Sequence, residues 1–494
     1  MDFFTVGLPT ALQLTNIVYC FAGVTLGTFI GVLPGIGPLA AVSLLLPVTI
    51  YLNPTTALVM LAGIYYGAEY GGSITSILLN MPGTPGNAIT VLDGHPLAKQ
   101  GKAGTALFTA AFSSFCGGSL GILALMLIAP AIVRVALSFG AAEYFAAILL
   151  ALIAASTVSG GSPLKGLAML IGGMLIGTIG TDHYTGVARY SWGQLDLIDG
   201  VTLPLVALGL FGVGEVALSA GIKVRRKVTA VSLWSMLPTR SELRRAFLPI
   251  LRGAGYGSIF GALPGVGPAV ATVVSYATEK KVSATPEKFG TGMIEGVAAP
   301  EASNNAAVQT AFIPTLSLGI PGSPTTAVLL GALIMNGIIP GPRLVTEQPE
   351  LFWGLIASFW VGNVLLLVLN VPLISVWVSV LRIPYSLLYP GIISLVCVGV
   401  YSIHSSSFEV LMVMGFGVAG YAMRLLNLQL APFLLGFILG PMLEQNLRRA
   451  LLLAGGDFIN VVTRPIAGSL LACILLIAVW VFYASYRARR REGT

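Results

Sequence analysis

The stretch GVLPGIGP, residues 31–38, interrupts a run of apolar residues that would otherwise suit a membrane helix. Proline removes a backbone donor and clashes with the preceding helical turn, and glycine permits positive φ, so this stretch ends a helix and turns the chain. Nearly the same motif returns as GALPGVGP at residues 261–268. Its recurrence predicts two matched structural features rather than a local irregularity.

The composition around these motifs is that of a membrane protein. Of the 494 residues, 56% are apolar and 9% are charged, and the mean hydropathy is +0.90. Soluble domains carry about 25% charged residues. Windows such as 105–133 and 466–486 exceed the roughly 20 apolar residues that span a bilayer. The sequence therefore predicts an all-α polytopic membrane protein with about 12–14 membrane segments.

The residues that commonly carry enzyme chemistry are sparse. No GxxxxGK[ST], HExxH, CxxC or DxxxD motif is present, so ATP hydrolysis and intramembrane metal or diphosphate chemistry lack their usual residues. We expect no enzymatic activity, and no cofactor other than a coupling ion. The cysteines and histidines are isolated from one another and are expected to be small buried side chains and solvated or capping residues, respectively: Cys20, Cys116, Cys397, Cys473, His95, His183 and His404.

The basic residues gather in two places. One is the segment 221–247, with Lys223, Arg225, Arg226, Lys227, Arg240, Arg244 and Arg245, and the other is the C-terminal tail YRARRREGT. Cytoplasmic loops of membrane proteins carry an excess of lysine and arginine, so this positive-inside rule predicts that both segments lie in the cytoplasm and flank membrane helices. The first twenty residues contain no basic residue, so they lack the positive start of a cleaved signal peptide.

Further features repeat when the two PGxGP motifs are aligned. The turn MPGTPGN at 81–87 matches IPGSPTT at 320–326, and Glu69 is matched with Glu301. We therefore expect a first transmembrane repeat at 1–220, a basic cytoplasmic linker at 221–247, a second repeat at 248–446, and a terminal helix with a basic tail at 447–494.

Counting the crossings predicts that the two repeats are inverted. Linker and tail lie on one side, so an even number of crossings separates them. Without the terminal helix, an odd number of crossings is left for the second repeat. If the first repeat has the same number of crossings and ends at the linker, its orientation in the membrane is opposite to that of the second repeat. Arginines 448, 449 and 464 oppose this topology, because they fall in a loop that it places outside. Inverted repeats with broken or re-entrant helices are the common plan of secondary transporters, whose substrates bind near the membrane midplane.

Four breaks, at 34–38, 82–86, 264–268 and 321–325, are expected to surround a site. Helix N-termini favour an anion such as a carboxylate, and free carbonyls can hold a small cation. The predicted substrate-binding residues are Asn80, Pro82, Gly83, Thr84, Pro85, Gly86, Asn87, Gly322, Ser323, Pro324, Thr325 and Thr326. The predicted coupling-ion residues are Gly35, Gly37, Glu69, Ser73, Gly265, Gly267, Glu301, Asn304 and Asn305.

Alternative roles stay open for the charged members of this set. A carboxylate inside a bilayer costs about 2.5–3.5 kcal/mol on insertion scales, so a function is expected for Glu69 and Glu301. Each is equally suited to binding a proton or sodium ion or to capping a broken helix end. Lys165 and Arg189 are better explained as membrane anchors than as partners of substrate carboxylates, because both fall near predicted helix ends.

Several long stretches resemble a known family. GVLPGIGP, YYGAEYGGSITSILLNMPGTPGNAITVLDGHPLAKQGKAGTAL, GTIGTDHYTGVARYSWGQLDLIDG and EASNNAAVQTAFIPTLSLGIPGSPTTAVLLGALIMNGIIPGP are similar to the large membrane subunit of the tripartite tricarboxylate transporters, the TctA type. The resemblance implies a secondary transporter of the bacterial inner membrane that imports tricarboxylates or related carboxylates. It also implies a small TctB-type membrane subunit, a periplasmic TctC-type solute-binding protein, and a sodium or proton gradient as the driving force.

The resulting hypothesis is alternating access. The broken-helix tips hold the carboxylate, Glu69 or Glu301 holds the coupling ion, and a block that carries the tips moves between the two membrane faces. The alternative is a channel-like or uncoupled carboxylate permease. A channel would equilibrate its substrate without needing a binding protein, and a non-transporting scaffold would tolerate alanine at Glu69 and Asn304.

Overall fold

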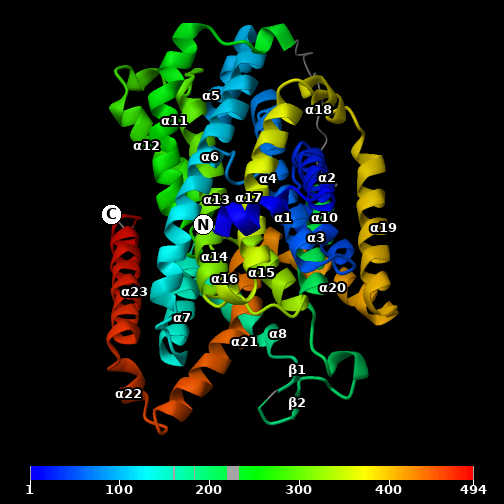
Figure 1. Cartoon of the computed structure of the whole chain (residues 1–494), viewed down its shortest axis with the longest axis vertical. Coiled ribbons are helices and arrows are strands. Elements are labelled where there is room, and N and C mark those ends of the chain that lie inside the picture. The colour runs from blue at the N-terminus through cyan, green and yellow to red at the C-terminus, as the bar shows by residue number, and fades with distance from the viewer. Residues whose placement is uncertain (1, 159–161, 183, 220–232, 493–494) are drawn as a thin grey trace. The chain divides into compact units, whose positions relative to one another are not determined.

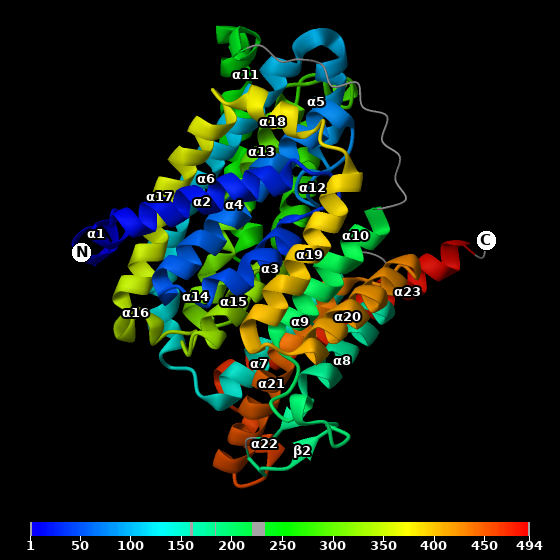
Figure 2. The same ribbon diagram turned by 90° about the vertical axis from the view of Figure 1, so that its right-hand side faces the viewer.

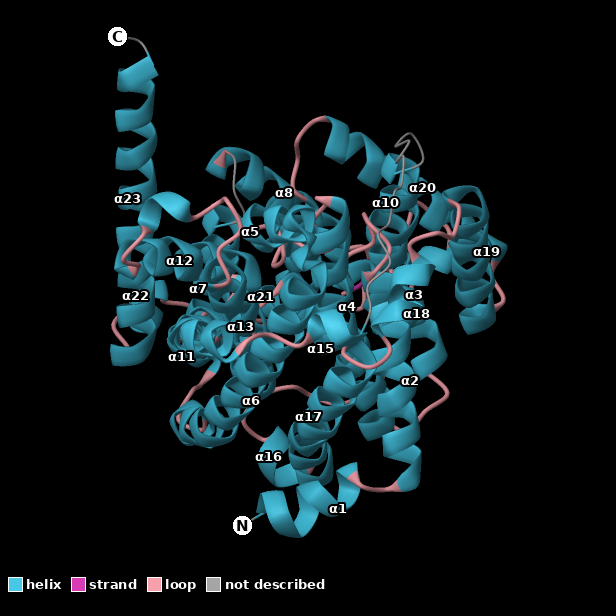
Figure 3. Cartoon of the chain, turned by 90° about the horizontal axis from the view of Figure 1, so that it is seen from above, coloured by secondary structure: helices cyan, strands magenta, loops and turns pink. Residues whose placement is uncertain are grey.

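The computed structural model describes residues 2–158, 162–182, 184–219 and 233–492. Most of the described chain is helical, and loops join the helices (Figure 3). The predicted lysines and arginines at 223–227 and His183 lie outside the described residues. The all-α prediction is confirmed.

The helices follow one another along the chain with few other elements. In the first half they are α1 (Leu8–Ala11), α2 (Leu14–Gly31), α3 (Pro38–Thr49), α4 (Pro54–Leu79), α5 (Thr90–Leu97), α6 (Ala103–Ala136), α7 (Ala141–Val158), α8 (Pro163–Gly177), α9 (Leu203–Ala207) and α10 (Gly214–Ser219). In the second half they are α11 (Arg240–Gly261), α12 (Gly267–Val282), α13 (Glu295–Thr310), α14 (Phe312–Leu318), α15 (Pro324–Met335), α16 (Leu344–Glu347), α17 (Pro349–Asn370), α18 (Ile374–Val380), α19 (Tyr385–His404), α20 (Ser407–Leu425), α21 (Leu430–Leu453), α22 (Phe458–Val462) and α23 (Pro465–Glu492). Two short strands, β1 (Gly180–Thr181) and β2 (Ala188–Arg189), pair antiparallel, and short π- or 3₁₀-helical segments include η2 (Ala98–Lys102) and η6 (Pro286–Lys288).

Six helical segments of the described chain are long and apolar enough to cross a membrane. They are Leu14–Gly31, Thr90–Ala136, Pro349–Asn370, Leu387–His404, Ser407–Leu425 and Leu430–Leu453. Shorter apolar helices, such as Pro38–Thr49 and Pro324–Met335, adjoin the predicted breaks. Long helices together with short, interrupted ones are the arrangement expected of a multi-pass membrane protein.

The chain divides into two compact units. Unit 1 comprises Met1–Val133 and Pro204–Ala422, and unit 2 comprises Arg134–Leu203 and Met423–Thr494. Each unit therefore takes segments from both predicted repeats, so this division is not the repeat division, which stays a prediction. In unit 2, α21 packs against α7 and α8, and α23 packs against α7.

All four predicted breaks lie between helices or in the first turn of the following helix. α2 ends at Gly31 and α3 begins at Pro38, while α11 ends at Gly261 and α12 begins at Gly267. Gly35 and Gly267 have φ of 89° and 69°, a region that other residues rarely adopt. Proline at the start of α3 and α15 costs no hydrogen bond, because the first amides of a helix have no intrahelical partner.

Two boundaries differ from the sequence prediction. Residues 240–247, expected in the linker, form the first turns of α11, because Thr239 and Glu242 cap that helix reciprocally. Arg448 and Arg449, expected in a loop, lie inside α21.

Glycines bring helices together in unit 1. Figure 2 shows α2 beside α4, and α11 packs along α13. In both pairs, glycines four residues apart allow the backbones to approach closely, as in small-xxx-small packing of membrane helices. The contacts are Gly23, Gly27 and Gly31 against Met60, Ile64 and Ala68, and Gly253, Gly257 and Gly261 against Ala299, Ser303 and Ala307.

These contacts correct one part of the repeat alignment. When the pair α2 and α4 is aligned with the pair α11 and α13 by these glycine contacts, the turn at 81–87 falls on the turn at 320–326. The same alignment places Asn80, the left-handed residue that ends α4, on Gly319, the left-handed residue that ends α14. In this register Glu69 corresponds to Val308, so its expected match with Glu301 is wrong by about two helical turns. The alignment of the two helix pairs is set by where the glycines contact the facing helix, not by the fact that Glu69 and Glu301 are both glutamates. The inverted relation of the repeats stays a prediction.

The glycine contacts predict a strong effect of a single added side chain. In Gly257→Val the new Cβ would meet the Ser303 carbonyl and lie 2.8 Å from the Ala306 Cβ, so α11 would have to move away from α13. We expect destabilisation by at least about 1–3 kcal/mol, the usual cost of overpacking. The matched control is Gly255→Val on the same helix, where a Cβ meets no atom within 4 Å. Thermal unfolding in detergent checks this, and equal unfolding temperatures for the two variants would contradict it.

Candidate functional site

One buried face of α4 organises the candidate site. Tyr65, Glu69 and Ser73 are spaced four residues apart and so lie on the same side of the helix. All three are buried, with Glu69 only 2% exposed. The helix begins where Asn53 accepts a hydrogen bond from the Thr56 amide, and it ends at left-handed Asn80, where the chain turns into the loop 81–89.

The Glu69 carboxylate contacts both the loop 81–89 and α13. Its Oε2 accepts hydrogen bonds from Thr84 Oγ1 at 2.7 Å and from Asn304 Nδ2 at 3.0 Å. Gly86 lies directly against the Asn304 amide, so a side chain at Gly86 would displace it. The loop is therefore fitted closely to a pair of residues that are 235 positions apart in sequence.

The Glu301 carboxylate has a denser set of partners. Its Oε1 accepts from Thr90 Oγ1 at 2.5 Å and Asn87 Nδ2 at 3.2 Å, and its Oε2 accepts from Ser73 Oγ at 2.7 Å and Ser114 Oγ at 3.0 Å. These donors come from α4, α5, α6 and the loop between α4 and α5. Glu301 is fully buried on α13.

The loop 81–89 joins the two carboxylates into one network. Asn87 Nδ2 donates to Ser73 Oγ at 2.9 Å as well as to Glu301, and Asn87 Oδ1 lies 2.7 Å from Thr84 Oγ1, which reaches Glu69. We call this network the acidic cluster; it comprises Glu69, Ser73, Thr84, Asn87, Thr90, Ser114, Glu301 and Asn304.

The acidic cluster contains two carboxylates and no cationic side chain. Among the described residues, no ion pair involves Glu69 or Glu301. The buried Asn304 Oδ1 has no hydrogen-bond partner. Burying unpaired carboxylates is costly, so the arrangement favours a bound proton or cation.

The ligand atoms of the acidic cluster suit a small hard cation. Carboxylate, hydroxyl and amide oxygens are the ligands that hard cations prefer. A cavity of about 10 Å³ adjoins the cluster and is lined by Ser73 and Ser114 among others, which is room for about one water molecule. Within the described chain, no three His, Cys, Asp or Glu side chains come together as a transition-metal site would require.

The second predicted tip has a different environment. Ser323 and Thr326 cap α15 reciprocally, and Ser323 Oγ lies 3.3 Å from the Tyr65 hydroxyl, one turn of α4 away from Glu69. The glycine at position 267, in the second PGxGP loop, lies beside Ser323. An aromatic group of Tyr65, Tyr66, Phe312 and Phe359 packs here, with ring centroids 4.9–6.5 Å apart. Hydroxyls and aromatic rings therefore surround this tip, and no carboxylate corresponds to Glu69.

The structure brings together only part of each predicted residue set. Glu69, Ser73, Glu301 and Asn304 from the coupling-ion set meet Thr84 and Asn87 from the substrate set, while Gly83 packs against Gly72. Asn305 bonds the Glu301 carbonyl of its own helix, and Gly35 faces Ser219. The remaining members are either exposed or outside the cluster: Asn80, Pro82, Pro85, Gly37, Gly265, Gly322, Pro324 and Thr325.

Sequence reasoning missed four polar residues that matter to this arrangement. Thr90 and Ser114 bond Glu301, and Tyr65 reaches Ser323. Asp93, fully buried on α5, accepts hydrogen bonds from the amides of Gly290, Gly292 and Met293 at 2.8–2.9 Å and thereby ties α5 to the loop that precedes α13. Ser114 carried a usable signal, because it is a polar residue within the apolar window 105–133.

Arg189 and Lys165 already have partners within unit 2. Arg189 donates two hydrogen bonds of 3.0 Å to the Glu444 carboxylate and also pairs with Asp182. The Tyr184 amide and Arg189 hold the pKa of Asp182 below its ordinary value, because both stabilise the charged carboxylate. Lys165 Nζ donates to the Leu426 carbonyl at 3.0 Å. These contacts fit the anchoring interpretation of both residues.

Comparison with known proteins gives the family. The model of the tripartite tricarboxylate transporter TctA family matches residues 17–435. An uncharacterized 52.8 kDa protein in the TAR-I ttuC' 3'region of Agrobacterium vitis is 48% identical over 486 residues, which cover 98% of this chain and 97% of that protein. An uncharacterized protein in the TAR-II ttuC' 3'region of the same organism is 49% identical over 236 residues, covering 48% of this chain and 98% of that protein. No solved structure matches.

The matched range contains the four helix breaks and every residue of the acidic cluster. The predicted resemblance is thus confirmed: this multi-pass membrane protein, with its four broken helices, belongs to the tripartite tricarboxylate transporter TctA family and is a large transporter subunit.

Proposed function

We propose that this subunit imports tricarboxylates or related carboxylates as a secondary transporter, and that a sodium ion or proton held by the acidic cluster supplies the coupling. The observation that carries the proposal is the burial of Glu69 and Glu301 in one network of hydroxyl and amide groups without a cationic side chain. Transport by gradient coupling needs a site whose charge changes when the ion binds. Two unpaired carboxylates beside a helix break provide such a site.

The ion and the carboxylate substrate bind at different places in this proposal. The cavity of about 10 Å³ beside the acidic cluster, which neither carboxylate lines, has room for about one water molecule, whereas a tricarboxylate needs far more room. We assign the carboxylate to the space that opens between the loop 81–89 and the tip at 320–326 when these segments part. The hydroxyls of Ser323, Thr325 and Thr326 and the start of α15 would then face the anion.

Movement of the tips couples the two sites in this proposal. The loop 81–89 donates to both carboxylates through Thr84 and Asn87, so a change in the charge of either carboxylate when the ion leaves alters the hydrogen bonds that hold the loop. Binding the ion would restore the fit of the loop and favour the state that accepts substrate. Alternating access between the two membrane faces would follow from this change.

The family context supplies the expected partners and location. A tripartite transporter has further subunits, and we assign a small TctB-type membrane subunit and a periplasmic TctC-type solute-binding protein to this one. We place the chain in the bacterial inner membrane with the basic C-terminus in the cytoplasm, in agreement with positive-inside counting. A role as an enzyme is not part of this proposal.

Uptake by proteoliposomes tests the proposal. The vesicles would hold this chain and its small partner, with the binding protein and labelled carboxylates outside, and a sodium or a proton gradient would be imposed separately. We expect accumulation above equilibrium that requires the binding protein and one of the two gradients.

The opposite results have a clear meaning. Flux that only equilibrates the carboxylate, whichever gradient is imposed, would favour a channel and contradict the role of the acidic cluster. Accumulation that does not require the binding protein would contradict the tripartite arrangement.

A further inference from the structure

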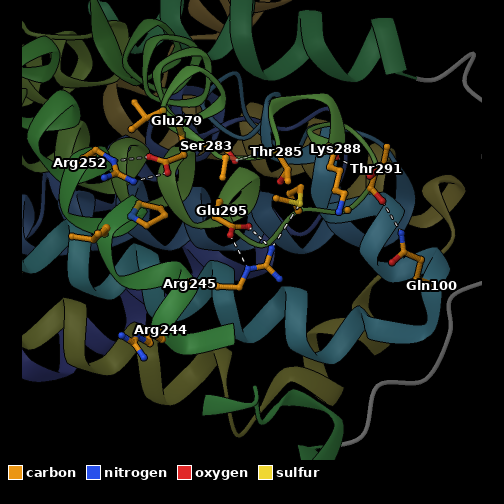
Figure 4. Close-up of a pocket in the computed structure, with 16 residues that line it drawn as sticks. Gln100, Arg244, Arg245, Arg252, Glu279, Ser283, Thr285, Lys288, Thr291 and Glu295 are labelled. Carbon is orange, nitrogen blue, oxygen red and sulfur yellow. Dashed lines mark hydrogen bonds and ion pairs between the residues drawn. The ribbon is translucent and has the colours of Figure 1, made fainter. Parts of the chain in front are cut away.

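A second polar site lies at the basic end of unit 1. It is a cavity of about 730 Å³ between the first turns of α11, the end of α12 and the segment 283–295, and Gln100 of η2 completes its wall. We call it the basic pocket. Its charged lining residues are Arg244, Arg245, Arg252, Lys288, Glu279 and Glu295 (Figure 4). It shares no residue with the acidic cluster.

Two of the arginines are neutralised by bidentate ion pairs. Arg245 holds Glu295 with two hydrogen bonds of 2.8 Å, and Arg252 holds Glu279 with bonds of 2.9 and 2.7 Å. Figure 4 shows both pairs within the wall of the pocket. Bidentate arginine–carboxylate pairs have a fixed geometry, so these four residues form a rigid frame.

The frame leaves two positive charges uncompensated. Within the described residues, Arg244 and Lys288 form no ion pair, and both side chains are exposed. Four cations against two carboxylates give the pocket a net charge of +2. A pocket of this sign and shape attracts a phosphate group, which arginine and lysine both bind well.

An apolar wall adjoins these charges. Leu248 and Val282 line the pocket and are 56% and 58% exposed. Three further apolar side chains of α11 are exposed: Phe247, Leu251 and Ile259. Together with Leu248 they form an outward stripe on the side of α11 opposite the glycines that pack on α13. A soluble phosphate would leave this wall in water, whereas an acyl chain would cover it.

From this juxtaposition we infer that the basic pocket binds the headgroup of an anionic phospholipid, with an acyl chain lying on the outward stripe of α11. Arg244 and Lys288 supply the unpaired charge that attracts the phosphate, while the Arg245–Glu295 and Arg252–Glu279 pairs hold the walls in place. Basic pockets at the ends of membrane helices commonly accept such headgroups. The inference does not depend on the proposed function, because it concerns different residues.

Lipid titration of the purified full chain tests this inference. Native mass spectrometry in detergent would count bound phosphatidylglycerol, with phosphatidylcholine as the neutral comparison and inorganic phosphate as the soluble competitor. We expect the wild-type chain to prefer phosphatidylglycerol, and Arg244→Gln/Lys288→Gln to bind it roughly 10- to 30-fold more weakly, from the usual worth of two basic residues at a membrane surface. Inorganic phosphate should not displace the lipid.

A matched control separates the pocket from general charge. Arg240→Gln/Lys281→Gln removes the same charge from exposed positions beside the pocket that do not line it, and its affinity should stay within about twofold of wild type. The conservative variant Arg244→Lys/Lys288→Arg should retain binding and shows that a loss is not misfolding. Equal weakening in both charge-removing variants, no preference for phosphatidylglycerol, or displacement by inorganic phosphate would each overturn the inference.

Discussion

Replacing Glu69 by glutamine is expected to abolish gradient-driven accumulation of the carboxylate. The variant keeps the size of the side chain, but it removes the charge and sets an amide donor among Thr84 Oγ1 and Asn304 Nδ2, which both donate to Glu69. Both donors reach the same oxygen, Oε2, and glutamine keeps one acceptor oxygen, so the effect comes from the lost charge, which the proposed coupling ion needs. We expect uptake to fall by at least roughly 100-fold, which corresponds to about 2.8 kcal/mol. The measurement is the initial rate of uptake by proteoliposomes under the effective gradient.

A surface glutamate provides the control for this variant. Glu347 has a side chain that is 62% exposed, so Glu347→Gln changes the net charge equally without touching the acidic cluster. Its uptake should equal that of the wild type. Glu69→Asp keeps the charge and should retain part of the activity. If Glu69→Gln accumulates substrate at the wild-type rate, Glu69 has no part in coupling.

Replacing Glu301 by alanine is expected to destabilise the whole of unit 1. The carboxylate accepts hydrogen bonds from Thr90, Ser73, Ser114 and Asn87, and the variant leaves these buried donors without their acceptor. Each buried unsatisfied donor costs about 1–3 kcal/mol. The four donors together cost about 4–12 kcal/mol, which exceeds the roughly 2.5–3.5 kcal/mol that removing a charge from the bilayer would save. We expect a net loss of about 2–5 kcal/mol in the free energy of unfolding.

Thermal unfolding in detergent measures this effect. Glu301→Gln keeps an acceptor oxygen for the hydroxyls and should lose clearly less stability than Glu301→Ala. Val308→Ala on the same helix is also fully buried, and it controls for the removal of side-chain volume. An unfolding temperature of Glu301→Ala equal to that of the wild type would show that the hydrogen bonds around Glu301 do not stabilise the fold.

Much of the architecture could be predicted because its causes are local. Proline and glycine change the backbone at their own positions, so the four breaks followed from GVLPGIGP, GALPGVGP and the turns at 82–86 and 321–325. Hydropathy marks membrane helices from a window of about 20 residues, without knowledge of their neighbours. The boundary at residue 240 was missed because a capping box is a two-residue signal within a strongly charged segment.

The candidate site could be predicted only as a set of residues, not as an arrangement. Glu69 and Glu301 attracted attention as carboxylates in apolar surroundings, but matching them as equivalent positions was wrong, since glycine contacts set the register of α4 and α13. Thr90 and Ser114 are ordinary hydroxyl residues in sequence, and only the packing of α5 and α6 against α13 makes them partners of Glu301.

The sequence by itself determined that this chain is a membrane protein with paired broken helices and buried carboxylates, because hydropathy, proline and glycine act over a few residues. The tertiary structure alone decided that both carboxylates share one network with the loop 81–89, and that Arg244 and Lys288 stay unpaired beside an apolar wall. The physical reason is that hydrogen bonds and ion pairs act over about 3 Å. Which residues come that close is fixed by helix contacts between segments that are hundreds of positions apart.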